Sequence, residues 1–215
     1  GARSVLLAHT ATDQVETLLL RLVRGTGRRG LGGMREVRPL SDPAGDGTRL
    51  FRPFLGLERA DLRSFCERHG HWFHDDPTND DDRPRARLRR EVLPVLESIQ
   101  PGAVTRIART SALLRDEEDH LQSEASRLAR EAGDRVAALA RLELPLLRRV
   151  LSQWAAGALG SSRRLSSAHV ESLVQLVRDG RGEVELPSDR TARCVATVVD
   201  GSIRLVRRPR GREEA

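Results

Sequence analysis

The feature that most constrains the fold is a short apolar run, followed by polar side chains and then by a helical apolar pattern. Val5 to Ala8 has the length of one buried strand, and the apolar residues from Val15 to Val23 recur at the spacing of an amphipathic helix. The polar residues from His9 to Glu16 lie where the strand would pass into the helix. In open α/β sheets, ligands bind at this carboxyl edge of the strands. We therefore predict an α/β fold with its functional residues at the start of this helix.

The acidic pair at that helix start has two interpretations. Asp13 and Glu16 are three residues apart, as in a capping box in which Asp13 accepts from backbone N–H groups and Glu16 reaches back. Acidic residues are favoured in any first helical turn, and His9 could be an ordinary loop histidine. The same side chains could equally act on a ligand. Spacing alone leaves the choice open.

Three blocks of sequence between His9 and Pro94 resemble one enzyme family. The blocks are HTATDQVET with RGTG and GLGGM (residues 9–34), RPFL (52–55), and DPTN with RARLRREVLP (76–94). In this order they resemble the tRNA(Ile)-lysidine synthases, members of the PP-loop (N-type) ATP pyrophosphatase superfamily. Thr12 and Ala86 depart from the family pattern, which usually has Asp or Asn at the first position and Asn at the second.

The resemblance implies a fold and a division into domains. We expect the C-terminal part of a Rossmann-like PP-loop (adenine nucleotide alpha hydrolase-like) domain over residues 1–100. A long connecting helix over 101–134 and a C-terminal helical/β domain over 135–215, which contacts tRNA, would follow. The SGGxDS loop with which the family grips phosphate has no counterpart here. We therefore expect a fragment of a longer protein, incomplete by itself.

The resemblance also implies a reaction. Such enzymes use ATP to adenylate the C2 oxygen of the wobble cytidine in tRNA(Ile) with a CAU anticodon, and the ε-amino group of free L-lysine then displaces AMP. ATP and Mg²⁺ are the expected cofactors, tRNA(Ile) and free L-lysine are the expected partners, and the cytoplasm is the expected location. The oligomeric state stays open, with a homodimer as one alternative. No membrane partner is expected, because no apolar run approaches the roughly 18 to 20 residues of a span.

Roles for individual residues follow from their match to the family motifs. The catalytic residues implied are Asp13, Glu16 and Arg89. The substrate- and nucleotide-binding residues implied are His9, Gln14, Arg24, Gly25, Thr26, Gly27 and Arg85. The arginines assigned to tRNA are Arg28, Arg29, Arg87 and Arg90. No metal site built by the protein is predicted, and the ligands of the magnesium expected with ATP are not identified.

Charge and composition point to a polyanionic partner. The net charge is +6, every basic residue other than histidine is arginine, and the arginines cluster over 21–38, 83–90 and 204–212. Such clusters fit phosphate contacts, although a solvated surface explains any single member. Aromatic residues make up 3% of the chain, so a base-stacking platform is not indicated. Shape and phosphate recognition of folded RNA suits this composition better.

Two other functions remain open. A related PP-loop tRNA-modifying enzyme such as a tRNA thiolase would share the fold, but we would expect paired cysteines, and the chain has only Cys66 and Cys194. A non-catalytic tRNA-binding module is the second alternative. The acidic loop from His74 to Asp82 could hold a divalent cation, but charge compensation by the arginines that follow is favoured.

The remaining pattern predicts mostly helices. A helix over 57–69 would bury Leu62, Phe65 and Cys66, and one over 85–96 would bend or end at Pro94. The longest regular stretch runs from 103 to about 132. Further helices would start near Pro145 and after a Ser166 or Ser167 cap, the latter ending at Gly180. Short strands over 183–186, 192–199 and 202–206 would follow, the last two joined by an Asp200-Gly201 hairpin turn.

Overall fold

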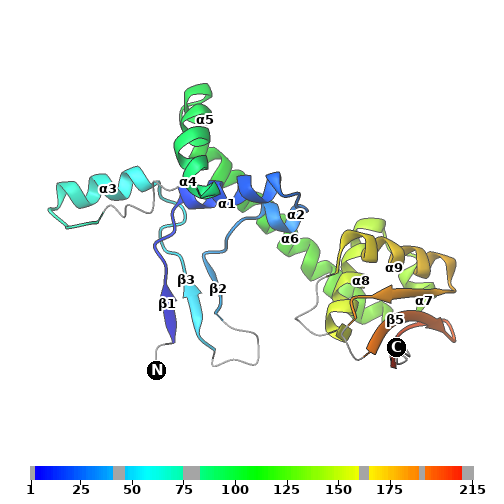
Figure 1. The fold of residues 1–215 in the computed structure, drawn as a ribbon. Coiled ribbons are helices and arrows are strands. Elements are labelled where there is room, and N and C mark those ends of the chain that lie inside the picture. The colour runs from blue at the N-terminus through cyan, green and yellow to red at the C-terminus, as the bar shows by residue number, and fades with distance from the viewer. Residues whose placement is uncertain (1–2, 41–46, 75–82, 160–164, 189–191, 210–215) are drawn as a thin grey trace, which may run out of the picture. The chain divides into compact units, whose positions relative to one another are not determined.

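The computed structural model describes residues 3–40, 47–74, 83–159, 165–188 and 192–209 (Figure 1). The chain divides into two compact units, Gly1–Glu118 and Asp119–Ala215. The division falls inside helix α6 (Ala103–Ala132), whose predicted bounds are confirmed. The functional domains expected over 1–100, 101–134 and 135–215 stay a prediction.

The first unit contains a small mixed sheet. Its strands are β1 (Ser4–Leu6), β2 (Val37–Pro39) and β3 (Arg49–Phe51), in the order β1-β3-β2. β1 pairs in parallel with β3, and β2 pairs antiparallel with it. The strand expected near Val5 to Ala8 is present as β1, but the prediction that it is buried is wrong, because Leu6 is 67% exposed.

Helices follow the strands in this unit. They are α1 (Ala11–Val23), α2 (Arg28–Leu31), α3 (Arg59–Arg68), α4 (Pro84–Arg87) and α5 (Leu93–Ile99). A small core joins α1, α5 and the first turns of α6 through the buried residues Ala11, Val15, Leu93 and Val104. This packing holds the start of α1 in place.

The predicted inward face of α3 is not buried. Phe65 is 47% exposed, and Leu62 and Cys66 are only partly buried, so the expected buried thiol is wrong for Cys66. Phe65 instead contacts the ring of His69, with ring centroids 4.4 Å apart. Charged residues occupy most other positions of α3, which leaves an apolar stripe too narrow to form a core.

The predicted helix over 85–96 is interrupted, as its proline suggested. A π-helical turn, Leu88–Val92, separates α4 from α5, and the N–H of Leu93 bonds to the carbonyl of Leu88. Pro94 lies in the first turn of α5. A proline has no N–H and its ring clashes with the preceding turn, so the wider π turn lets the helix continue past it.

The second unit is helical with a small antiparallel sheet. Its further elements are α7 (Val136–Leu139), α8 (Leu144–Leu159), α9 (Ser167–Asp179), β4 (Glu183–Leu186), β5 (Ala192–Val199) and β6 (Ser202–Pro209). The sheet order is β4-β5-β6, and one core cluster joins α8, α9 and this sheet.

The local signals predicted for the second unit are confirmed. Ser166 caps α9, Gly180 ends it with φ 64°, and Pro145 lies in the first turn of α8. Asp200 and Gly201 both have positive φ, 49° and 72°, as a tight hairpin turn requires. Along the stretches of chain that the structure describes, no helix is both long and apolar enough to cross a membrane.

Candidate active site at the start of α1

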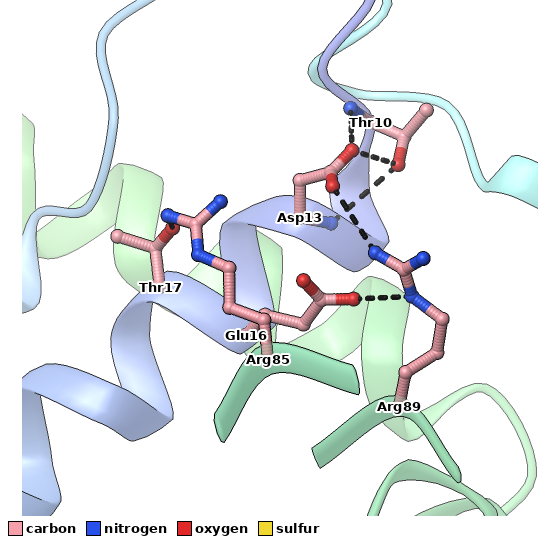
Figure 2. A network of polar contacts seen from close by, with 6 residues as sticks. All are labelled: Thr10, Asp13, Glu16, Thr17, Arg85 and Arg89. Carbon is pink, nitrogen blue, oxygen red and sulfur yellow. Dashed lines mark hydrogen bonds and ion pairs between the residues drawn. The ribbon is translucent and has the colours of Figure 1, made fainter. Parts of the chain in front are cut away.

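A cluster of polar side chains surrounds the first turns of α1 (Figure 2). His9 and Thr10 lie between β1 and this helix, and Asp13, Glu16 and Thr17 lie on the helix itself. Arg85 of α4 and Arg89 of the π turn approach from a segment about seventy residues later in the chain. The structure therefore brings together Asp13, Glu16, Arg85 and Arg89, four residues to which the motifs assign roles.

The helix cap differs from the predicted one. The Oδ2 atom of Asp13 accepts hydrogen bonds from the backbone N–H and the hydroxyl of Thr10, both at 2.8 Å. The N–H of Asp13 in turn donates to Thr10 Oγ1 at 3.5 Å, which completes a capping box. The capping interpretation of Asp13 and Glu16 is therefore wrong, because Thr10 supplies the cap and Asp13 is the residue that reaches back. Glu16 takes no part.

Glu16 instead forms a buried ion pair with Arg89. Its side chain is 0% exposed, and its Oε1 accepts from Arg89 Nε at 2.7 Å. Arg89 also lies 3.7 Å from Asp13 Oδ1. Burial by itself would lower the pKa of Arg89, but the hydrogen bond and the charge of Glu16 outweigh it and raise that pKa. The arginine therefore stays charged between the two carboxylates.

The second oxygen of Glu16 is the exceptional atom of the cluster. Glu16 Oε2 is buried and has no hydrogen-bond partner among the residues that the structure describes. Buried polar atoms nearly always have a partner, and one without a partner requires an explanation such as a bound ligand or ion. An anion would be repelled by a carboxylate, so the missing partner is a donor.

The two arginines contact adjacent residues of α1. Arg85 Nη2 donates to Thr17 Oγ1 at 3.2 Å, while Arg89 holds Glu16. The guanidinium of Arg85 is otherwise exposed. An arginine fork with unused donors at the rim of a carboxylate pair is suited to bind an anionic group such as a phosphate.

His9 contacts an arginine that the motif analysis left without a role. The Nε of Arg52 donates to His9 Nδ1 at 3.0 Å, and Arg52 is only 7% exposed. Burial is the largest influence on His9 and lowers its pKa below 6.5, Arg52 and Arg85 lower it further, and Asp13 opposes them. The ring is therefore neutral near neutral pH.

Gln14 serves the backbone of the GLGGM turn. It is 2% exposed, its Oε1 accepts from the N–H of Met34 at 2.7 Å, and its Nε2 donates to the Met34 carbonyl at 3.2 Å. Both polar groups of the side chain are thus used within the protein. Contact of Gln14 with a nucleotide stays a prediction.

The same turn is held by donors from α1 and α6. Arg21 donates to the carbonyls of Gly30 and Gly33, at 2.8 and 3.0 Å. Ser111 donates to the Leu31 carbonyl at 2.8 Å, and Arg115 donates to those of Gly32 and Met34, at 3.2 and 2.6 Å. Together with Gln14, these side chains bind five consecutive carbonyls. The sequence analysis missed Ser111 and Arg115; the serine's interruption of the apolar stripe in α6 was the available signal.

The RGTG segment lies at the far end of α1. Arg24 is the C-cap of the helix, where a cation is favoured by the helix dipole. Because a helix rises about 1.5 Å per residue, Arg24 lies about 16 Å along the axis from Asp13. Gly25 has a φ of 76°, which favours glycine, and a Cβ on Gly25 or Gly27 would meet no atom within 4 Å. The structure does not bring Arg24, Gly25, Thr26 and Gly27 to the carboxylates, and their binding of nucleotide stays a prediction.

The arginines assigned to tRNA are exposed and mostly form ion pairs on the surface. Arg28 pairs with Glu117, and both Arg87 and Arg90 pair with Glu91. Exposed pairs of this kind contribute little to stability, so a phosphate can replace the carboxylate at low cost. Arg29 is exposed beside Arg28.

No clustered metal ligands are found in the described portion of the chain. No group of three His, Cys, Asp or Glu side chains there could hold a metal ion. The acidic loop and the DPTN motif fall within 75–82, outside the described residues. The two carboxylates of the cluster already face Arg89, so these residues do not by themselves fit Mg²⁺.

Comparison with known proteins shows a domain match and a set of similar enzymes. A profile of the PP-loop domain matches residues 1–96. The tRNA(Ile)-lysidine synthase of Mycolicibacterium paratuberculosis is 42% identical over 214 residues, which cover 95% of this chain and 63% of that protein. The enzyme of the same name from Rhodococcus opacus is 39% identical, over 99% of this chain and 62% of that protein. That of Geobacter sulfurreducens is 38% identical, over 88% of this chain and 41% of that protein. The chain thus spans about half the length of these relatives. Residues 1–96 thus carry a PP-loop domain, and the chain is similar over most of its length to the tRNA(Ile)-lysidine synthases.

Proposed function

We propose that this chain carries part of the active site of a tRNA(Ile)-lysidine synthase, an ATP-dependent ligase. The reaction joins L-lysine to C2 of the wobble cytidine of tRNA(Ile) with a CAU anticodon, after activation of that position by adenylation. The observation that carries the proposal is Glu16, a fully buried carboxylate with one oxygen on Arg89 and the other without a donor. The similarity to enzymes of this name over most of the chain supports it.

The side chains of the cluster have complementary tasks in this reaction. Asp13 and Glu16 provide negative charge for the amine-bearing substrate, and Glu16 Oε2 accepts an N–H of that substrate once adjacent side chains move to admit it. In a site from which water is excluded, this interaction is stronger than in water. Arg85 and Arg89 provide donors for phosphate oxygens. The attacking amine itself must be neutral.

ATP supplies the adenylyl group that makes C2 reactive. The described residues provide the arginine donors just named for its phosphates. Mg²⁺ is expected to accompany ATP, and the described residues contain no group of three His, Cys, Asp or Glu side chains to hold it. Arg28, Arg29, Arg87 and Arg90, together with residues 135–215, contact the tRNA in this proposal.

The test is lysine incorporation by the product of the complete reading frame that contains this chain. We expect labelled L-lysine to enter a tRNA(Ile) transcript with a CAU anticodon only when ATP is present. A transcript with guanosine at the wobble position is the RNA control. Glu16→Gln keeps the shape but removes the charge and should lower the rate by about 100-fold or more. Glu67→Gln, the same exchange on the exposed face of α3, should not.

Each contrary outcome identifies another function. If Glu16→Gln turned over at the wild-type rate, Glu16 would be a structural residue only. Binding of tRNA without lysine incorporation by the wild-type protein would make it a non-catalytic tRNA-binding module. Incorporation of sulfur in place of lysine would make it a PP-loop thiolase.

A further inference from the structure

His9 and Arg52 follow different strands, β1 and β3, yet their side chains meet at one edge of the sheet. β1 and β3 are parallel neighbours, with Val5 opposite Leu50, so the residues that follow them leave the sheet at the same edge. Arg52 directly follows β3, and His9 comes three residues after β1. The hydrogen bond from Arg52 Nε to His9 Nδ1 joins the two exits at 3.0 Å.

Arg52 is held rigidly at this position. Its N–H donates to the Glu36 carbonyl at 2.7 Å, and its Nη1 donates to the Arg35 carbonyl at 2.8 Å. The residue is 7% exposed, so its side chain has little freedom to rotate. The Nε–H that faces His9 is therefore fixed by the strand that carries it.

The direction of this hydrogen bond decides where the imidazole proton lies. The guanidinium of arginine has donors and no acceptor, so His9 Nδ1 must be the acceptor. A neutral imidazole with an accepting Nδ1 carries its proton on Nε2. A doubly protonated ring would place an N–H against the N–H of Arg52. The bond therefore selects one tautomer of the neutral ring.

We propose that Arg52 is a positioning residue that holds His9 as the neutral tautomer protonated on Nε2, so that His9 meets a ligand only as a hydrogen-bond donor. With Nδ1 bonded to Arg52 and Nε2 protonated, the ring has no free lone pair and does not act as the base for the lysine amine. Its ligand is an oxygen acceptor, such as a phosphate oxygen of the nucleotide. For the identity of this ligand, the inference rests on the proposed function.

The charges around His9 agree with this state. Arg52 and Arg85 face the ring as cations and disfavour its protonation, Asp13 favours it, and burial adds to the effect of the arginines. These groups lie at the end of β3, on α4 and on α1.

The test is the tautomer of His9, measured by long-range ¹H–¹⁵N correlation spectra of the chain labelled with ¹⁵N-histidine. The chain has six histidines, and the spectrum of His9→Gln assigns the His9 signals by their loss. We expect a pyridine-like Nδ1 and a pyrrole-like Nε2 near pH 7. A proton on Nδ1, or rapid exchange between both tautomers, would overturn the proposal without any variant at Arg52.

A second arm tests the role of Arg52 itself. Arg52→Met should leave His9 with mixed tautomers and raise its pKa, because the attraction of Asp13 is then less opposed. Arg49→Met makes the same exchange at an exposed position of the same strand and should change neither. An unaltered His9 in Arg52→Met would refute the positioning role. The spectra need no ATP, lysine or tRNA, so they report the tautomer of His9 even if the proposed function is wrong. Conversely, lysine incorporation would still support the proposed function if His9 had another tautomer.

Discussion

At the scale of single residues, Glu16 has a task that its helix does not require. Thr10 and Asp13 already cap α1, so the carboxylate of Glu16 is free to bind a residue 73 positions away. A charge at 0% exposure is tolerated only when it is paired, and Arg89 provides the pair. The stability of this unit and the charge of the candidate site therefore depend on the same contact.

Substitution of Arg89 should lower the stability of the first unit. Arg89→Met leaves the Glu16 carboxylate buried without its partner and should lower the free energy of unfolding by about 3 kcal/mol, the lower end for such pairs because Arg89 is partly exposed. Urea unfolding followed by circular dichroism measures it. The double variant Glu16→Leu, Arg89→Met should recover most of the loss. A double variant as unstable as the single one would mean that the packing of Arg89, rather than its charge, matters.

His9 should make stability depend on pH in a defined direction. Its pKa is lowered below 6.5 in the folded chain, chiefly by burial, so at a pH between the two values the unfolded chain binds more protons. The contribution of His9 is therefore complete above pH 6.5 and is lost as the pH falls through the folded pKa. Urea midpoints of wild type and His9→Gln, measured over this range, should converge as the pH falls. Parallel curves would contradict the lowered pKa.

At the scale of elements, side-chain hydrogen bonds attach the GLGGM turn to α1 and to the first half of α6. Five successive carbonyls accept from side chains of these two helices, which leaves the turn little freedom. Gly33 has φ 65°, and a Cβ there would lie 2.5 Å from the Gln14 amide. Glycine is therefore required at position 33 for two reasons, its left-handed backbone conformation and the close approach of Gln14.

Gly33→Ala should consequently be costly. We expect a loss of about 2 kcal/mol or more in unfolding free energy, because the left-handed backbone and the displacement of Gln14 both contribute. Gly56→Ala is the matched control, because its Cβ would meet nothing within 4 Å and its φ is not positive. Thermal unfolding of both variants gives the comparison. Equal melting temperatures for the two would show that the turn adapts without loss.

At the scale of the whole molecule, the net charge of +6 and its arginine clusters should make RNA binding sensitive to salt. The slope of log Kd against log salt concentration should decrease in magnitude by about one in Arg29→Gln, if Arg29 contacts one phosphate. Arg127→Gln is the control, because Arg127 lies on α6 outside the arginine clusters over 21–38, 83–90 and 204–212. Filter binding of a tRNA(Ile) transcript at several salt concentrations measures both. An unchanged slope in Arg29→Gln would remove this residue from the interface.

The sequence by itself determined most local elements and named several residues of the candidate site. The long helix α6, the Asp200-Gly201 hairpin and the Ser166 and Gly180 caps follow from periodicity and turn chemistry, which act over a few residues. The motifs also named Asp13, Glu16, Arg85 and Arg89, which the structure brings together. The resemblance to the enzyme family pointed to these residues, because spacing alone left a capping box as an equal alternative.

Only the tertiary structure decided which side chains meet and in what state. The pairing of Glu16 with Arg89 spans 73 positions, and that of His9 with Arg52 spans 43. Such contacts depend on the path of the chain through the parallel strands and the π turn, which no local pattern encodes. The exposure of α3 and of Leu6 has the same origin, because burial depends on what packs against a surface and not on the apolar character of the surface alone.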